Sequence, residues 1–486
     1  MGEIRLHGLC AIVACLTLVA ASCSSGEGLP SNNAQLGSST TEVTTTTDEA
    51  SESATTAVDS TAPGTGSGTP AESPNILILI ADDMGVESSP CFDGAAPAPN
   101  LEAACANGVV FDQAWSSPVC SPTRAGVLTG RHSFRTGVGT LVNSRSNGQA
   151  LSTDEVTLPR ALDLADTGYA TASFGKWHLG GDENAPNELG WDHFSGVLSG
   201  GIRSYFNWSE VTNGTTTQHE DYYATTANVD GARDWIEAQD GPWLTWIGFN
   251  APHTPFHVPP EDLHSFDLVD DGAAIDANPL PYYQASIEAM DSEIGRLLEV
   301  VDLDNTVVIF MGDNGTPLAV SSFARGEAKG SLQEGGVHVP MFAWGAGVES
   351  GVRSDALVGT IDVFATALDL AGVDLGSPDV GLPVIDSISF AGVLDGSSSG
   401  ERTLMLSEHF GADVRDNQGG ATIRDEQYKL TSLSNGSLFL SDLVADPNGE
   451  TRIGSNEGTA EERAAFERLS AALNGWTSDP SAPAPS

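Results

Sequence analysis

The sequence has 486 residues, 40% of them hydrophobic, which is enough for one large globular domain and a smaller second one. Acidic residues outnumber basic residues by 66 to 20, and the formal net charge of −46 excludes a protein that binds nucleic acid through a basic surface. The charge does not exclude an enzyme for anionic substrates, because salt screens charges more than about 8 Å from a cationic pocket.

The N-terminus has the pattern of a secretory signal over residues 1–23. Arg5 and His7 precede an apolar run over residues 9–20, which is too short to span a bilayer. Small residues then lead to Cys23, as in a bacterial lipoprotein box. We therefore expect an exported lipoprotein, at the cell surface or in the periplasm, whose contact with the membrane is a lipid anchor on Cys23. The alternative is an ordinary signal peptide that is cleaved without lipidation.

Residues 24–73 consist mainly of Ser, Thr, Gly, Pro, Ala and acidic residues. Such a segment cannot bury enough apolar surface to offset the entropy of ordering it. We interpret it as a disordered tether with an end-to-end distance of about 40 Å.

Four apolar runs follow, without polar alternation. This pattern is typical of strands that are buried on both faces of a mainly parallel sheet. Helical patterns between the runs, for example at 158–164 and 283–300, indicate an α/β fold. The runs cover residues 75–80, 169–174, 243–249 and 306–311.

Polar residues come directly after each run, where ligands bind in sheets of this kind. They are Asp82 and Asp83, then Lys176 and His178, then His253, then Asp313 and Asn314. One such strand end means little, but four together indicate one site. The chain has three lysines, and both Lys176 and Lys329 lie in glycine-flanked loops.

Asp82, Asp83, Asp313 and Asn314 are hard oxygen donors. Taken singly, each pair is a common turn sequence. Together they suit calcium better than zinc, with magnesium as the second choice.

The cysteines of the body have different expected roles. Cys91 and Cys105 either form a disulfide or remain two buried thiols. Cys120 opens the segment Cys120-Ser-Pro-Thr-Arg124, in which Pro122 suits the first turn of a helix. Cys120 would then lie at a helix N-terminus, which favours an oxyanion.

The segment Cys120-Ser-Pro-Thr-Arg124, with Leu-Thr-Gly-Arg131 after it, resembles the signature of the type I, formylglycine-dependent sulfatases of the alkaline phosphatase superfamily. Similarity continues towards the C-terminus. The resemblance implies a large, mostly parallel sheet sandwiched by helices, with a smaller C-terminal antiparallel sheet plus helix. It implies a catalytic domain at 74–375 and a small C-terminal subdomain at 376–486. Other matching motifs lie at 75–83, 175–180, 252–255, 312–315, 329–340, 423–430 and 440–447.

The resemblance also implies that a formylglycine-generating enzyme oxidises Cys120 to formylglycine, whose hydrate attacks a small-molecule or glycan sulfate ester. Arg124 would stabilise the hydrate, and Lys176 and Lys329 would bind the sulfate. His253 would contact the substrate and protonate the departing ester oxygen, and His178 would act as the base that releases sulfate. Calcium would be held by Asp82, Asp83, Asp313, Asn314 and the modified Cys120.

Two other functions remain open at this point. One is a phosphate or phosphonate ester hydrolase on the same scaffold, and the other is an inactive surface binding protein. The sequence does not choose between carbohydrate and aryl sulfates. Arg203, Tyr205, Phe206 and Trp208 would either contact the substrate or pack inside the protein.

Overall fold

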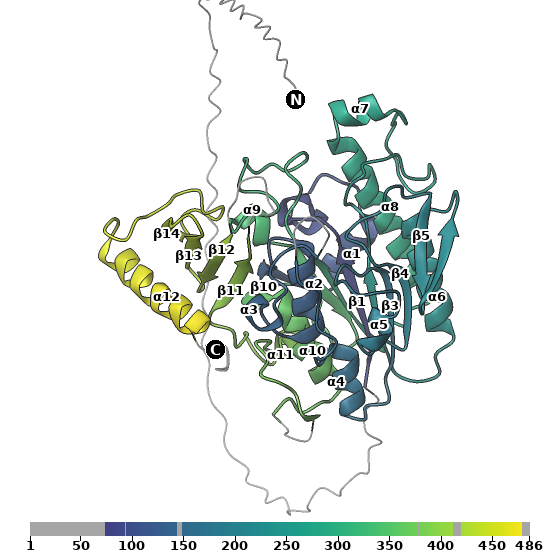
Figure 1. The fold of residues 1–486 in the computed structure, drawn as a ribbon, viewed down its shortest axis with the longest axis horizontal. Helices are drawn as coiled ribbons and strands as arrows, with labels where there is room; N and C mark the ends of the chain where they lie inside the picture. Colours follow the sequence, from purple (N-terminus) through teal and green to yellow (C-terminus); the bar gives the residue numbers. More distant parts are fainter. Residues whose placement is uncertain (1–72, 93, 143–147, 377–379, 412–418, 479–486) are drawn as a thin grey trace, which may run out of the picture. The chain divides into compact units, whose positions relative to one another are not determined.

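A computed structural model describes residues 73–478, apart from residue 93 and the segments 143–147, 377–379 and 412–418 (Figure 1). The predicted signal, the lipid anchor at Cys23 and the tether up to residue 72 lie outside the described residues. None of the helices in the described part has both the length and the apolar character needed to cross a bilayer.

The larger sheet has ten strands in the order β10-β2-β9-β8-β1-β7-β3-β4-β5-β6. Its centre is parallel, because β1 pairs with β7 and β8, and β3 pairs with β7 and β4, in the same direction. The four predicted apolar runs form β1, β3, β7 and β8, which are consecutive neighbours in this order. The strands are β1 (Asn75–Ala81), β2 (Val109–Trp115), β3 (Ala170–Lys176), β4 (His193–Val197), β5 (Trp208–Thr212), β6 (Thr215–His219), β7 (Trp243–Gly248), β8 (Thr306–Gly312), β9 (Met341–Gly345) and β10 (Val352–Gly359).

Helices cover both faces of this sheet, which explains why its central strands are buried almost throughout and mainly apolar. Side chains alternate along a strand, so Ile76, Ile78 and Ile80 of β1 enter one core with α2, α4 and α10. Leu77 and Leu79 enter a second core with α1, α6 and α8. The predicted α/β fold with helices on both sides is confirmed.

The main helices are α1 (Pro99–Ala106), α2 (Cys120–Thr129), α4 (Leu158–Leu164), α6 (Ala224–Glu237), α8 (Leu280–Leu298) and α10 (Val363–Leu370). Shorter ones are α3 (Ser133–Thr136), α5 (Ala185–Glu188), α7 (Gly272–Ala277), α9 (Glu334–Val337) and α11 (Ala391–Leu394). Helix α4 has the predicted bounds, whereas α8 begins three residues before the expected Tyr283. Pro281 lies in its first turn, where a missing N–H costs nothing.

A second sheet follows near the C-terminus, as predicted. Its four strands pair antiparallel in chain order, and α12 (Ala460–Ser478) packs on them through Phe466, Leu469 and Trp476. Phe390 and Val393 still pack in the core of the larger sheet, and the domain boundary at 375/376 stays a prediction. The strands are β11 (Met405–His409), β12 (Gly420–Arg424), β13 (Tyr428–Leu433) and β14 (Leu438–Asp442).

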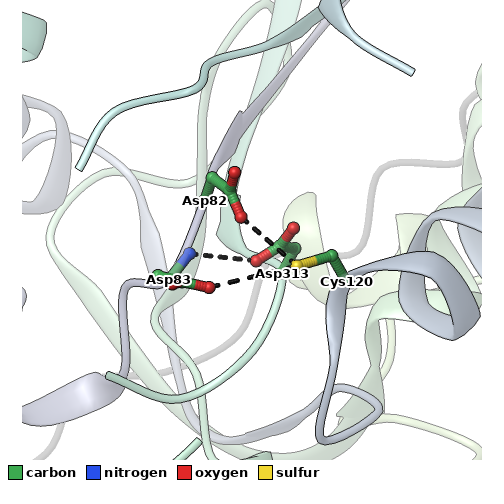
Figure 2. A group of neighbouring side chains, drawn as sticks. All are labelled: Asp82, Asp83, Cys120 and Asp313. Carbon is green, nitrogen blue, oxygen red and sulfur yellow. Dashed lines mark hydrogen bonds between the residues drawn. The ribbon is translucent and has the colours of Figure 1, made fainter. Parts of the chain in front are cut away.

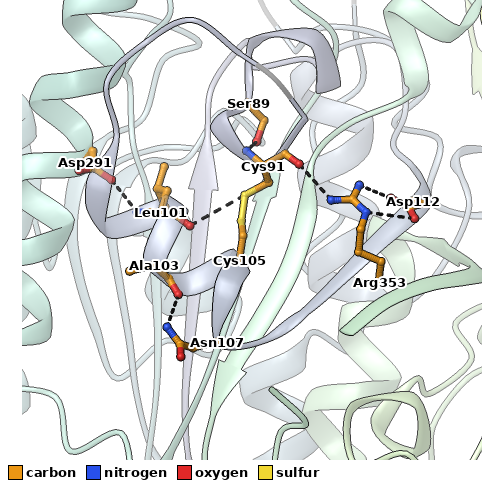
Figure 3. The surroundings of a disulfide bond; sticks show 9 residues. All are labelled: Ser89, Cys91, Leu101, Ala103, Cys105, Asn107, Asp112, Asp291 and Arg353. Atoms are coloured by element: carbon orange, nitrogen blue, oxygen red, sulfur yellow. Dashed lines mark hydrogen bonds and ion pairs between the residues drawn. A yellow bond between two sulfur atoms is a disulfide. The ribbon is translucent and has the colours of Figure 1, made fainter. Parts of the chain in front are cut away.

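Cys91 and Cys105 form a disulfide, which settles the two alternatives of the sequence (Figure 3). Their Cα atoms are 6.0 Å apart. The bond ties the loop that leaves the end of β1 to α1. Arg353 of β10 donates a hydrogen bond to the carbonyl of Cys91 at 3.1 Å and pairs with Asp112 of β2, so this loop is also held to the sheet.

Candidate active site

Four neighbouring strands bring the predicted site residues to one edge of the larger sheet. β8, β1, β7 and β3 are parallel, so their carboxyl ends lie side by side. Asp82 and Asp83 follow β1, Asp313 and Asn314 follow β8, and Lys176 ends β3. The N–H of Asp83 donates to Oδ1 of Asp313 at 3.1 Å, although the two residues are 230 positions apart.

The thiol of Cys120 completes a buried cluster with three carboxylates (Figure 2). One oxygen each of Asp82, Asp83 and Asp313 and the Cys120 sulfur all lie within 4.8 Å of one another. The thiol donates to Oδ1 of Asp82 at 3.4 Å. Cys120 is the first residue of α2, as predicted. Burial, reinforced by the Asp313 carboxylate, raises the pKa of this thiol, so the unmodified side chain is neutral and a weak nucleophile.

Two lysines bring positive charge to the same cluster. Nζ of Lys176 donates to Oδ2 of Asp82 at 2.5 Å. Lys329 forms an ion pair with Asp83, and its Nζ lies 3.7 Å from the sulfur of Cys120. Burial alone would raise the pKa of Asp82, but the ammonium group of Lys176 lowers that pKa below its usual value. Asp82 therefore stays ionised inside the protein.

Arg124 holds Asp313 in place. Its Nε and Nη2 donate to Oδ2 of Asp313 at 3.0 and 2.9 Å, and its Nη1 donates to the carbonyl of Lys176 at 2.8 Å. The guanidinium is fully buried, so a paired carboxylate is needed to offset its desolvation. These contacts hold the end of β3 and Asp313, a candidate metal ligand, in position. The expected action of Arg124 on a modified Cys120 stays a prediction.

His253 lies at the rim of the cluster. Its Nε2 is 3.6 Å from Oδ2 of Asp83, and its Nδ1 is 2.6 Å from the carbonyl oxygen of Thr254. A carbonyl accepts only, so Nδ1 carries a proton and Nε2 is left to exchange one with a ligand.

His178 is more deeply buried, with 4% of its surface exposed. Its Nδ1 has no hydrogen-bond partner among the described residues. Burial, followed by the positive charges of Lys176 and Arg124, lowers the pKa of this imidazole well below its usual value. His178 is therefore neutral.

Two glycines allow the chain after β4 to approach both imidazoles. A Cβ atom at Gly200 would lie 2.2 Å from Nε2 of His178, and one at Gly201 would lie 3.3 Å from Cε1 of His253. The first distance means that a side chain at Gly200 would force the ring of His178 out of its position. The glycine pair was not among the predicted site residues, because its importance depends on a contact between distant segments.

Tyr205 supports the loop that carries His253. Its hydroxyl is 2.6 Å from the carbonyl oxygen of Asn250 and 2.8 Å from that of His253. Trp208 also faces inward, since its Nε1 donates to the carbonyl of Tyr222. Of the two alternatives left open by the sequence, both aromatic residues take the packing role.

The donor atoms of the cluster fit a hard cation. Oδ1 of Asn314 is buried and has no hydrogen-bond partner in the described part of the chain, whereas its Nδ2 donates to Asp83 at 2.9 Å. An unpaired amide oxygen beside three carboxylates is the kind of ligand set that calcium prefers.

Comparisons with known proteins agree with this geometry. Residues 74–373 match the family described as Sulfatase. The arylsulfatase of Klebsiella aerogenes is 29% identical over 310 residues, which cover 50% of this chain and 66%, just under two thirds, of that relative. Arylsulfatase A of Homo sapiens is 30% identical over 427 residues, which cover 78% of each chain.

The fold is also shared with solved structures. The crystal structure of Ps i-CgsB in complex with k-i-k-neocarrahexaose superposes with a TM-score of 0.71 at 24% sequence identity. The superposition covers 85% of this chain and 96% of that one. At this sequence identity the similarity shows that the two proteins share a fold.

Proposed function

This chain belongs to the sulfatase family, and on that premise we propose that it hydrolyses sulfate esters with a formylglycine made from Cys120 and a bound calcium ion. One observation carries the proposal: Cys120 begins a helix inside a cluster of three carboxylates, with Lys329 and Lys176 beside it. The substrate would be a small-molecule or glycan sulfate ester, and a formylglycine-generating enzyme would act on the chain during maturation.

Asp82, Asp83, Asp313, Asn314 and an oxygen of the modified Cys120 would hold the calcium ion. When bound, calcium would polarise the sulfate group and favour ionisation of the attacking hydroxyl that the formylglycine hydrate supplies. Magnesium is the second choice, because it demands octahedral geometry and retains more of its own water.

The cationic side chains would bind the sulfate group. Lys176 and Lys329 are compact positive charges that can hold two sulfate oxygens and stabilise the charge that develops on them. Arg124 would keep Asp313 and the end of β3 in place, and it would stabilise the formylglycine hydrate.

The two imidazoles would move protons. The carbonyl of Thr254 keeps one proton on Nδ1 of His253, so in the imidazolium form the second proton, on Nε2, would be the one delivered to the departing ester oxygen. His178, buried and neutral, would take up a proton as sulfate is released.

The arrangement of the whole chain is proposed from its sequence. We infer an exported lipoprotein, anchored through Cys23, with a tether at 24–73. The catalytic domain would follow at 74–375 and the small C-terminal subdomain at 376–486.

The test uses the full chain, produced together with a formylglycine-generating enzyme. Mass analysis of the peptide that contains residue 120 reports conversion of the cysteine. The specificity constant kcat/KM is then measured on 4-nitrophenyl sulfate and 4-nitrophenyl phosphate, with Cys120→Ala as the inactive control. We expect the sulfate to be preferred. A preference for the phosphate would overturn the assignment, and an unmodified thiol in protein from the native host would favour an inactive binding protein.

A further inference from the structure

A cavity of about 600 Å³ lies along the chain that follows β4. It is formed by the chain after β4 together with β5 and β6. These strands end the strand order of the larger sheet, and Figure 1 labels β4 and β5 there. Gly201 lines this cavity and also lies against the ring of His253. Since His253 is the proposed proton donor to the departing oxygen, the leaving group would extend into this space.

The cavity has no carboxylate in its lining, although the chain contains 66 acidic residues. Three other cavities of the described part each include at least one, for example Glu87, Glu349 and Glu408. A lining without negative charge is the environment that an anionic ligand requires, because a buried or half-buried like charge would repel it.

Arg203 supplies positive charge to this lining. It is exposed and has no ion pair or hydrogen bond within the described residues. The other described arginines all have a partner, such as Asp313 for Arg124 or Asp425 for Arg468. The guanidinium of Arg203 therefore retains its full set of donors for a ligand, and it can bind a sulfate or carboxylate through two of them.

Apart from Val197, Ile202 and Trp208, the remaining side chains of the lining are polar. Asn207 and Gln218 contribute amide groups to the lining, and Oγ of Ser209 donates to Oε1 of Gln218 at 2.8 Å. Trp208 offers no free ring, because it is 5% exposed and packs against His219 at a centroid distance of 4.7 Å. Amides and hydroxyls suit the hydroxyl groups of a sugar better than an aryl ring.

We propose that this cavity is the leaving-group subsite and that it takes a saccharide sulfate ester with a second anionic group, a sulfate or a carboxylate, which Arg203 binds. The inference rests on the proposed function, since it identifies the class of substrate for the same site.

The test compares pairs of saccharides that share the hydrolysed sulfate ester and differ by a second sulfate or a uronic carboxylate. The two kinds of pair distinguish the two anions. The proteins are the wild type, Arg203→Gln, Arg203→Lys and Arg468→Gln, an exposed arginine on α12 that serves as the matched control. 4-Nitrophenyl sulfate is the reference substrate, and melting temperatures verify folding.

We expect Arg203→Gln to lower kcat/KM about 10- to 100-fold on the doubly anionic member and to change the other substrates less than about twofold. On the doubly anionic saccharide, the kcat/KM of Arg203→Lys should lie between those of the wild type and Arg203→Gln, and the kcat/KM of Arg468→Gln should match that of the wild type. Equal losses on both members of a pair, no preference of the wild type for the second anion, or hydrolysis of aryl sulfates alone would overturn the proposal. If converted enzyme hydrolyses no sulfate ester, the proposed function fails. Calorimetric binding of the doubly sulfated saccharide then decides the subsite, which stands if Arg203→Gln binds it more weakly and falls if the two proteins bind it equally.

Discussion

The hydroxyl of Tyr205 offers a sharp test of how the fold positions His253. Tyr205 is 1% exposed, and its ring stacks on His257 at a centroid distance of 4.0 Å. Burial raises the pKa of the phenol well above its usual value, so the hydroxyl is a donor at every working pH. Tyr205→Phe retains the ring and removes the donor that lies within 2.8 Å of the carbonyls of Asn250 and His253.

The size of the effect follows from this contact. Loss of one buried hydrogen bond costs about 1–2 kcal/mol. With about 400 folded residues and an unfolding entropy of about 2.1 cal/mol/K per residue, the melting temperature should fall by about 1–3 °C. A general acid contributes about 10²–10⁴ to a rate, and a loosened His253 should lose part of this. We expect kcat to fall about tenfold on an alkyl sulfate and about twofold on 4-nitrophenyl sulfate, whose leaving group needs little protonation.

The assay is a series of sulfate esters with increasing leaving-group pKa, together with thermal denaturation. Tyr205→Phe should give a steeper dependence of log kcat on that pKa than the wild type. Tyr222→Phe is the matched control, since its hydroxyl donates to Asp230 at 2.6 Å instead of to the loop of His253. A loss of kcat that is uniform across the series would refute the positioning role and leave only a structural one.

Three further outcomes are expected. Removal of divalent cations with EGTA should abolish activity and lower the melting temperature, because the clustered carboxylates then repel one another. Added calcium should restore both the activity and the melting temperature. A melting temperature that EGTA does not change would argue against a bound ion. Replacing Cys91 and Cys105 with serine opens a link between residues 14 positions apart and should cost about 3 kcal/mol in chemical denaturation, whereas a change below about 1 kcal/mol would contradict the constraint. Burial raises the pKa of Glu408 to about 7 from the ordinary 4.5, so its contribution to stability is complete below pH 4.5 and is lost as the pH rises through 7. Glu408→Gln cannot ionise, so its free energy of unfolding should fall by about 2 kcal/mol less than that of the wild type between pH 5 and pH 8. Urea denaturation at both pH values measures this difference. Equal decreases in the two proteins would show that Glu408 does not titrate in this range.

Much of the fold and the site could be predicted from local patterns. A continuous apolar run such as 75–80 has to be buried on both faces, which requires helices on both sides of a sheet. Parallel neighbours place their carboxyl ends together, so the sequence predicts that Asp82 and Asp313 lie close to each other. Pro122 likewise marked the first turn of the helix that begins at Cys120.

Other features depended on contacts between distant segments. The pattern around Arg203, Tyr205 and Trp208 does not say which side chain faces solvent. The structure decides it, because the hydroxyl of Tyr205 meets carbonyls 45 and 48 positions away, while Arg203 meets no described partner. The approach of Gly200 to His178 and the disulfide of Cys91 were undecided for the same reason.

The sequence by itself determined the four central strands, the residues at their ends and the chemistry those residues can perform, since each depends on neighbours along the chain. The tertiary structure alone decided which loop residues are buried, which charges are paired and where a cavity lies. Those properties depend on distances between segments that are far apart in sequence, and a local pattern carries no information about such distances.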